Sequence, residues 1–141
     1  MKKSKLFILP IIIFGLLLIS CGGGKYSDLK SVTNAYMNAI DNFVEDANNV
    51  KNASDAAEAL NNYADEMEKI MPTLKKMGEK YPELKKSKSN GENANPVIAE
   101  INKKMKNKIK EFIPAMIKLM RYANDPEVRK ASKRLRDIGR K

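Results

Sequence analysis

Apolar residues recur every three or four positions through most of this 141-residue chain. That spacing places them on one face of an α-helix, and no long segment alternates polar and apolar residues as a half-buried strand would. Residues that favour helices, such as alanine, leucine, lysine and glutamate, are abundant. The pattern predicts an all-α fold, a single antiparallel bundle of about four amphipathic helices.

Each of the four predicted helices has one apolar face. They cover residues 28–51, 54–77, 96–123 and 126–138. The polar segment 85–95 has the composition of an exposed loop, so it separates a first hairpin, 28–78, from a second, 96–139. Pro72 and Pro114 lie inside the second and third helices, and the apolar spacing continues across each proline, which predicts kinks rather than breaks.

Helix ends and apolar faces together define the expected bundle. Ser54 is predicted to cap the second helix, and Asn95 and Asp125, each followed by proline, are predicted to cap the third and fourth. The expected core is made of Leu29, Val32, Tyr36, Ile40, Phe43, Ala47 and Val50; Ala56, Leu60, Tyr63, Met67, Ile70, Leu74 and Met77; Ile98, Ile101, Met105, Ile109, Phe112, Met116, Leu119 and Ala123; and Val128, Ala131, Leu135 and Ile138.

Residues 57–72 align without gaps on residues 99–114, with Pro72 on Pro114. The alignment fits an internal duplication and equally fits two amphipathic helices that share a period. In both cases the second and third helices are expected to be structurally equivalent.

Positive charge is concentrated in the second half of the chain. Residues 25–86 hold nine basic and eleven acidic side chains, whereas residues 87–141 hold fifteen basic and six acidic ones. The hairpins are therefore complementary in charge, and acids of the second helix are expected to face lysines of the third. The residues concerned are Asp55, Glu58, Asp65, Glu66 and Glu68, opposite Lys103, Lys104, Lys106, Lys108 and Lys110.

The last predicted helix carries an unbalanced basic patch. The candidate anion-binding residues are Arg129, Lys130, Lys133, Arg134, Arg136 and Arg140. Cations beside an anionic lipid surface contribute about 1 kcal/mol each, and the planar arginine fork suits phosphate and sulfate groups. The partners this predicts are anionic lipid, lipopolysaccharide or an extracellular polymer. A solvated helix end, where the helix dipole favours cations, accounts for the same residues.

The first 20 residues have the layout of a cleavable export signal. Lys2, Lys3 and Lys5 precede an apolar run over residues 6–19, and small residues follow. A helix over that run would rise about 21 Å against a hydrocarbon core of about 30 Å, so it is too short to span a membrane. Export also argues against nucleic acid as the partner of a chain with a net charge of +10.

Leu18-Ile19-Ser20-Cys21 resembles the lipobox of bacterial lipoproteins. The resemblance implies that Cys21 becomes a diacylglyceryl cysteine carrying fatty acids such as palmitate, and that a peptidase cuts between Ser20 and Cys21. Gly22 after the cysteine implies transport to the outer membrane of the cell envelope rather than retention at the inner one. Residues 21–27 would form a flexible, lipidated tether, and residues 28–141 the helical domain.

The residue inventory excludes several kinds of catalytic site. The chain has no histidine and one cysteine, so His-based general bases, Ser-His-Asp and Cys-His sites, the common zinc sites and an internal disulfide are ruled out. The acidic pair Asp65-Glu66 lies on a polar helix face, and adjacent residues on a helix point apart, so no carboxylate acid–base pair is predicted. We expect no enzyme activity, cofactor or metal.

A non-catalytic binding or scaffolding role is the function that this sequence predicts. Two alternatives stay open, a surface-exposed adhesin and a periplasmic carrier or chaperone for an apolar ligand. The carrier is suggested by the seven methionines that follow the predicted signal peptide, since methionine makes adaptable apolar surfaces. The sequence leaves open which face of the membrane the protein occupies, whether it self-associates and whether it binds another protein.

Overall fold

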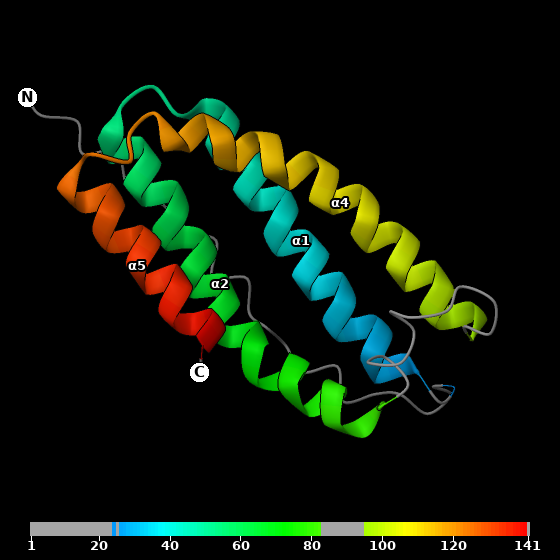
Figure 1. Ribbon diagram of the computed structural model, residues 1–141. Coiled ribbons are helices and arrows are strands. Elements are labelled where there is room, and N and C mark those ends of the chain that lie inside the picture. The colour runs from blue at the N-terminus through cyan, green and yellow to red at the C-terminus, as the bar shows by residue number, and fades with distance from the viewer. Residues whose placement is uncertain (1–23, 25, 83–94, 141) are drawn as a thin grey trace, which may run out of the picture.

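The computed structural model describes residues 24, 26–82 and 95–140. Within them the chain forms four helices, α1 (Ser27–Asn49), α2 (Ala53–Lys80), α4 (Pro96–Met120) and α5 (Pro126–Arg140), and no strand (Figure 1). The predicted all-α fold is therefore confirmed. The predicted signal peptide, including Ser20 and Cys21, lies outside the described residues.

Hydrogen bonds between side chains fix α1 and α2 as an antiparallel hairpin. Asn62 Nδ2 donates to Asp46 Oδ2 at 3.1 Å, and one turn further along each helix Asn42 Nδ2 donates to Glu66 Oε1 at 2.8 Å. As the residue number rises on α2, that of its partner on α1 falls, as an antiparallel pair requires.

The helix that follows the α1–α2 hairpin in the sequence does not pack on α2, its neighbour along the chain. α4 packs on α1, and α5 packs on α2 (Figure 1). Lys108 pairs with Asp41, and Lys118 Nζ donates to the Asn48 carbonyl at 2.6 Å, so α4 runs parallel to α1. Successive helices still alternate in direction along the chain.

The expected pairing of the second helix with the third is wrong. Lys108 of α4 pairs with Asp41 of α1, and two of the acids of α2, Asp65 and Glu68, pair instead with Arg134 of α5. The α1–α2 hairpin and the α4–α5 half of the chain are complementary in charge, but helical periodicity does not specify which helix of one half lies against which of the other.

The helix ends follow the sequence closely, with one correction. Asn95 and Asp125 cap α4 and α5 as predicted, because their side-chain oxygens accept the N–H groups of Val97 and Glu127 at 2.9 Å. α2 is capped by Asn52 and not by Ser54. Asn52 has the extended backbone of an N-cap, and the helix already includes Ser54.

Both internal prolines are accommodated. α2 continues through Pro72 to Lys80, and α4 continues through Pro114 to Met120. The two prolines are exposed, and the half-buried Leu74 and Met116 that follow them pack against the core. Apolar burial on the far side of each proline therefore compensates for the lost backbone hydrogen bond.

Three aromatic rings from three helices form the centre of the core. Phe43 of α1, which is 1% exposed, lies with its ring centroid 5.0 Å from those of Tyr63 on α2 and Phe112 on α4. Tyr63 and Phe112 lie 5.4 Å apart. Such tilted pairs bring a ring edge toward a ring face, which adds to the free energy gained by burial.

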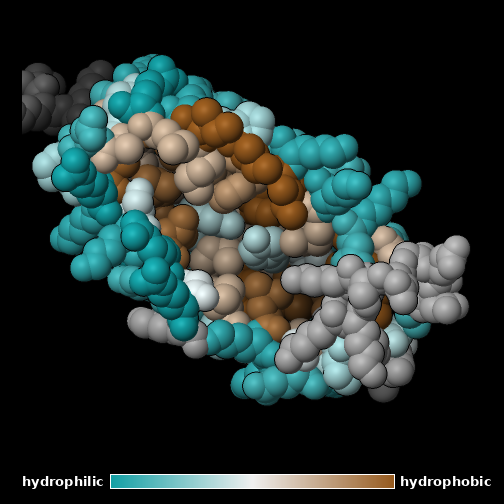
Figure 2. All heavy atoms as spheres, in the orientation of Figure 1, coloured by the Kyte–Doolittle hydropathy of each residue, from teal (hydrophilic) through white to brown (hydrophobic). Residues whose placement is uncertain are grey.

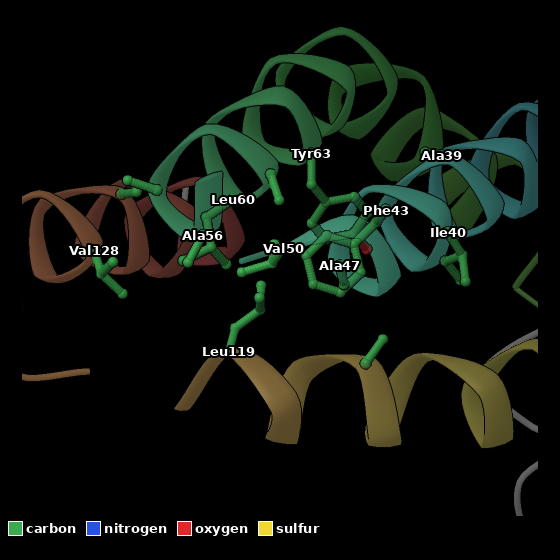
Figure 3. Packing of buried hydrophobic residues seen from close by; sticks show 14 residues of the cluster. Ala39, Ile40, Phe43, Ala47, Val50, Ala56, Leu60, Tyr63, Leu119 and Val128 are labelled. Atoms are coloured by element: carbon green, nitrogen blue, oxygen red, sulfur yellow. The ribbon is translucent and has the colours of Figure 1, made fainter. Parts of the chain in front are cut away.

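Small side chains let the helices approach around this centre. Figure 3 shows Leu119 pointing from α4 toward the α1–α2 hairpin, where Val50 and Ala47 lie. On the α5 side, Val128 and Ala131 join the same cluster and are at most 2% exposed. The core thus includes all four helices even though α4 and α5 hardly touch.

A second, smaller cluster closes the end of the molecule where α1 begins and α2 ends. Leu29 and Val32 pack against Tyr81, which is 3% exposed. The Tyr81 hydroxyl donates to Asp28 Oδ1 at 2.6 Å, and Lys80 pairs with the other oxygen of Asp28. The bonds from Lys80 and Tyr81 lower the pKa of Asp28 from 3.8 to about 2.

Asp28 is expected to make stability sensitive to acid. Because its pKa is lower in the folded state, its contribution is complete above about pH 4 and is lost as the pH falls through about 2. Its side chain is 35% exposed, so solvent screening limits the contribution to about 1 kcal/mol. Denaturant titrations across this range should show that Asp28→Asn is less stable than the parent protein at neutral pH and that the difference vanishes below pH 2. A difference that stays constant with pH would contradict this account.

Candidate functional site

α5 presents a row of cations to solvent. Val128, Ala131 and Ile138 of this helix are buried and Leu135 is half-buried, so the opposite face is exposed. Arg129, Lys133, Arg136 and Arg140 lie on that face, because spacings of four, three and four residues return to the same side of a helix. We call these four residues the α5 basic row.

No acidic side chain among the described residues pairs with the α5 basic row. Arg129 donates to the Ala123 carbonyl at 3.3 Å, which leaves its charge uncompensated. Lys130 is exposed beside the row and likewise has no acidic partner in the described part of the chain. The row is therefore available to an external anion.

Arg134 differs from the other basic residues predicted to bind anions. It projects toward α2, where it donates to Asp65 Oδ1 at 2.6 Å and to Glu68 Oε2 at 2.8 Å. These hydrogen bonds raise the pKa of Arg134. Arg134 thus holds α5 on α2, and the spacing of cations along one helix did not reveal this because its partners lie more than sixty residues earlier.

The α1–α2 hairpin bears a polar cleft of the opposite charge. A pocket of about 350 Å³ is lined by the side chains that join the two helices, including Asn42, Asp46, Asn62, Asp65 and Glu66. Asp46 lies five residues after Asp41, whose side chain pairs with Lys108 of α4, and five residues turn to a position about 140° around the helix. The cleft therefore opens away from α4.

The two halves of the molecule differ in charge as the sequence predicts. α1 and α2 contain ten acidic and five basic residues, and α4 and α5 contain twelve basic and four acidic ones. Since α4 and α5 lie on one side of the hairpin, the protein has a strong charge asymmetry between an acidic hairpin and a basic pair of helices. Such an asymmetry orients a protein at a charged surface.

α4 also carries exposed apolar residues that the predicted core does not contain. Ile113, Ile117 and Met120 are 51%, 60% and 65% exposed, and Ile109, which was assigned to the core, is 45% exposed. The assignment of Ile109 is wrong because α4 has two adjacent apolar stripes, of which α1 covers one. Two stripes on a single helix were the signal in the sequence, and periodicity alone does not say which is covered.

Comparison of the chain with protein-family models, curated proteins and solved structures found no match. Among the described residues, none of the helices combines the length and apolar character needed to cross a membrane. The same residues contain no cluster of three or more acidic, cysteine or histidine side chains placed to hold a metal ion. The candidate site is thus the α5 basic row and the surface around it.

Proposed function

We propose that this protein is a bacterial envelope lipoprotein, anchored through acyl chains on Cys21, whose α5 basic row binds anionic groups at the membrane surface. Its role is binding or scaffolding rather than catalysis. The observation that carries the proposal is the row itself, four exposed cations that no acidic residue of the described chain neutralises. Lipid headgroups, lipopolysaccharide phosphates and anionic polymers all present the group that such a row recognises.

The lipid anchor supports this function by keeping the row close to its partner. The tether from Cys21 to Tyr26 extends at most about 20 Å, so the anchored body stays near the surface at a high effective concentration. Each buried methylene of an acyl chain contributes about 0.8 kcal/mol, and two or more chains hold a protein firmly. The anchor supplies affinity for the membrane, and the row supplies preference for anionic surfaces.

Neutralising the row should weaken binding to anionic vesicles. The test uses the unacylated mature chain from Gly22, which keeps the core because the buried residues of the described chain lie between Leu29 and Ile138. Replacing all four row residues with glutamine should lower its affinity for phosphatidylglycerol-containing vesicles about a hundredfold or more, since each cation contributes about 1 kcal/mol. Co-sedimentation with vesicles, with and without the anionic lipid, measures this change.

A matched variant distinguishes binding by the α5 basic row from a general effect of net charge. Lys51, Lys69, Lys75 and Lys76 are exposed on the hairpin side of the molecule, and their replacement by glutamine removes the same charge. This control should keep nearly all of the affinity, and added salt should weaken binding of the parent protein. Equal losses in the two variants would show that only net charge matters and would contradict a site on α5.

The second candidate function is a carrier for an apolar ligand. Figure 2 shows that the surface between α4 and α5 is hollowed and lined by hydrophobic residues. A carrier would purify with bound lipid that salt does not remove, whereas a headgroup-binding protein would not. Extraction of the purified protein with organic solvent, followed by lipid analysis, distinguishes the two.

A further inference from the structure

The exposed apolar residues of α4 form one continuous row. Ile109, Ile113, Ile117 and Met120 are spaced by four, four and three residues, so they lie on one face over about 16 Å of helix. They are all of the large hydrophobic residues that the described chain exposes. We call them the α4 apolar row. Such an alignment marks an interaction surface, because single exposed apolar residues are normally scattered.

Lysines border the α4 apolar row. Lys106 and Lys110 lie at one edge of the row, with Lys103 just beyond them, and all three are exposed without an acidic partner in the described residues. An apolar stripe with lysines along its edge is the pattern of helices that lie in a membrane interface. There the lysine stems cover apolar surface while the ammonium groups reach the lipid phosphates.

The geometry of the anchor brings α4 to the same membrane. Asn95, which caps α4, approaches the Tyr26 hydroxyl at 3.4 Å, so α4 begins beside the point where the predicted tether enters the body. The tether from Cys21 is at most about 20 Å long. Figure 2 shows the hydrophobic residues of α4 and the hydrophilic surface of α5 on one face of the molecule.

A second copy of the chain fits this surface poorly. A two-fold dimer through the α4 apolar row would bring the lysines of two α4 helices together, and each α4 holds six basic and two acidic residues. Four side chains offer much less than the roughly 800 Å² per partner of a standard protein interface. The acidic hairpin, which would attract α4 electrostatically, exposes no large apolar residue in its described part.

We propose that the α4 apolar row inserts into the headgroup region of an anionic bilayer, so that α4 and α5 lie on the membrane and the acidic cleft of the hairpin faces away. This inference rests on the proposed function, because the same anchor and the α5 basic row bring α4 to the lipid. The isoleucine and methionine side chains enter the boundary between headgroups and acyl chains, and the bordering lysines bind phosphate. α4 lies in the plane of the surface and does not cross the bilayer.

The test uses the full acylated protein, inserted in phosphatidylglycerol-containing vesicles by its own anchor. Acylation consumes the thiol of Cys21, so a new cysteine is the single site for an environment-sensitive fluorophore. Ile113→Cys and Ile117→Cys test the row, and Asn62→Cys, on the exposed hairpin cleft, is the control. Lipids with a quencher just below the headgroups should quench positions 113 and 117 severalfold more than position 62.

Different results would identify which claim fails. Equal, weak quenching at all three positions on protein that remains bound to vesicles would overturn the insertion of α4 and leave the anchor intact. Protein that does not associate with vesicles at all would contradict the proposed function itself. If the fluorophore at position 117 is shielded from water only at high protein density on the vesicle, a second copy of the chain covers the α4 apolar row. That result would overturn the assignment of lipid as its partner.

Discussion

Phe43→Ala is expected to lower the free energy of unfolding by about 3–5 kcal/mol. Phe43 is 1% exposed, and its ring contacts both Tyr63 and Phe112. Alanine would leave a cavity where three helices meet, and the loss is a large fraction of the roughly 5–15 kcal/mol that stabilises a small domain. Urea titration of the mature chain from Gly22, followed by circular dichroism, measures the change.

Ile117→Ala is the matched control for this variant. Ile117 is 60% exposed, so its truncation should change the free energy of unfolding by no more than about 0.5 kcal/mol. A loss below about 1 kcal/mol for Phe43→Ala would mean that the three rings do not form the centre of the core. The two variants together also separate the role of packing in the core from the proposed role of the α4 apolar row at a membrane.

Cys21→Ala is expected to abolish lipid attachment completely. The proposed function takes the Cys21 thiol as the acceptor of the acyl chains, and the chain has no other cysteine to replace it. Cells given a labelled fatty acid should incorporate label into the parent protein and none into the variant, which should also keep its signal peptide. Ser31→Ala, an exposed change on α1, is a control that should leave labelling unchanged. Label in the Cys21 variant would contradict the assignment of the anchor.

Local sequence signals predicted the helices of this chain well. Asn95-Pro96 and Asp125-Pro126 placed two helix starts correctly, because a side-chain cap followed by proline depends on neighbouring residues only. The α1 stripe was equally reliable, since residues such as Ile40 and Ala47 are buried as their spacing indicates. The capping residue of α2 was missed because Asn52 and Ser54 are both good caps, and the choice depends on backbone geometry.

Contacts between distant segments could not be predicted in the same way. Periodicity gives the face that a helix buries and not the partner that buries it, so the packing of α4 on α1 and of α5 on α2 was missed. The same gap explains why Arg134 was grouped with the anion-binding residues although Asp65 and Glu68 bind it. It also explains the wrong assignment of Ile109 to the core, because the exposure of Ile109 depends on which apolar stripe of α4 packs against α1.

The most direct test of the account is the intact mass of the protein extracted from its native membrane. Lipidation of Cys21 should give the mass of residues 21–141 plus the acyl chains, and therefore a chain cut between Ser20 and Cys21. The unmodified mass of residues 1–141 would contradict the lipid anchor, and with it the arrangement in which α4 and α5 are held against the membrane.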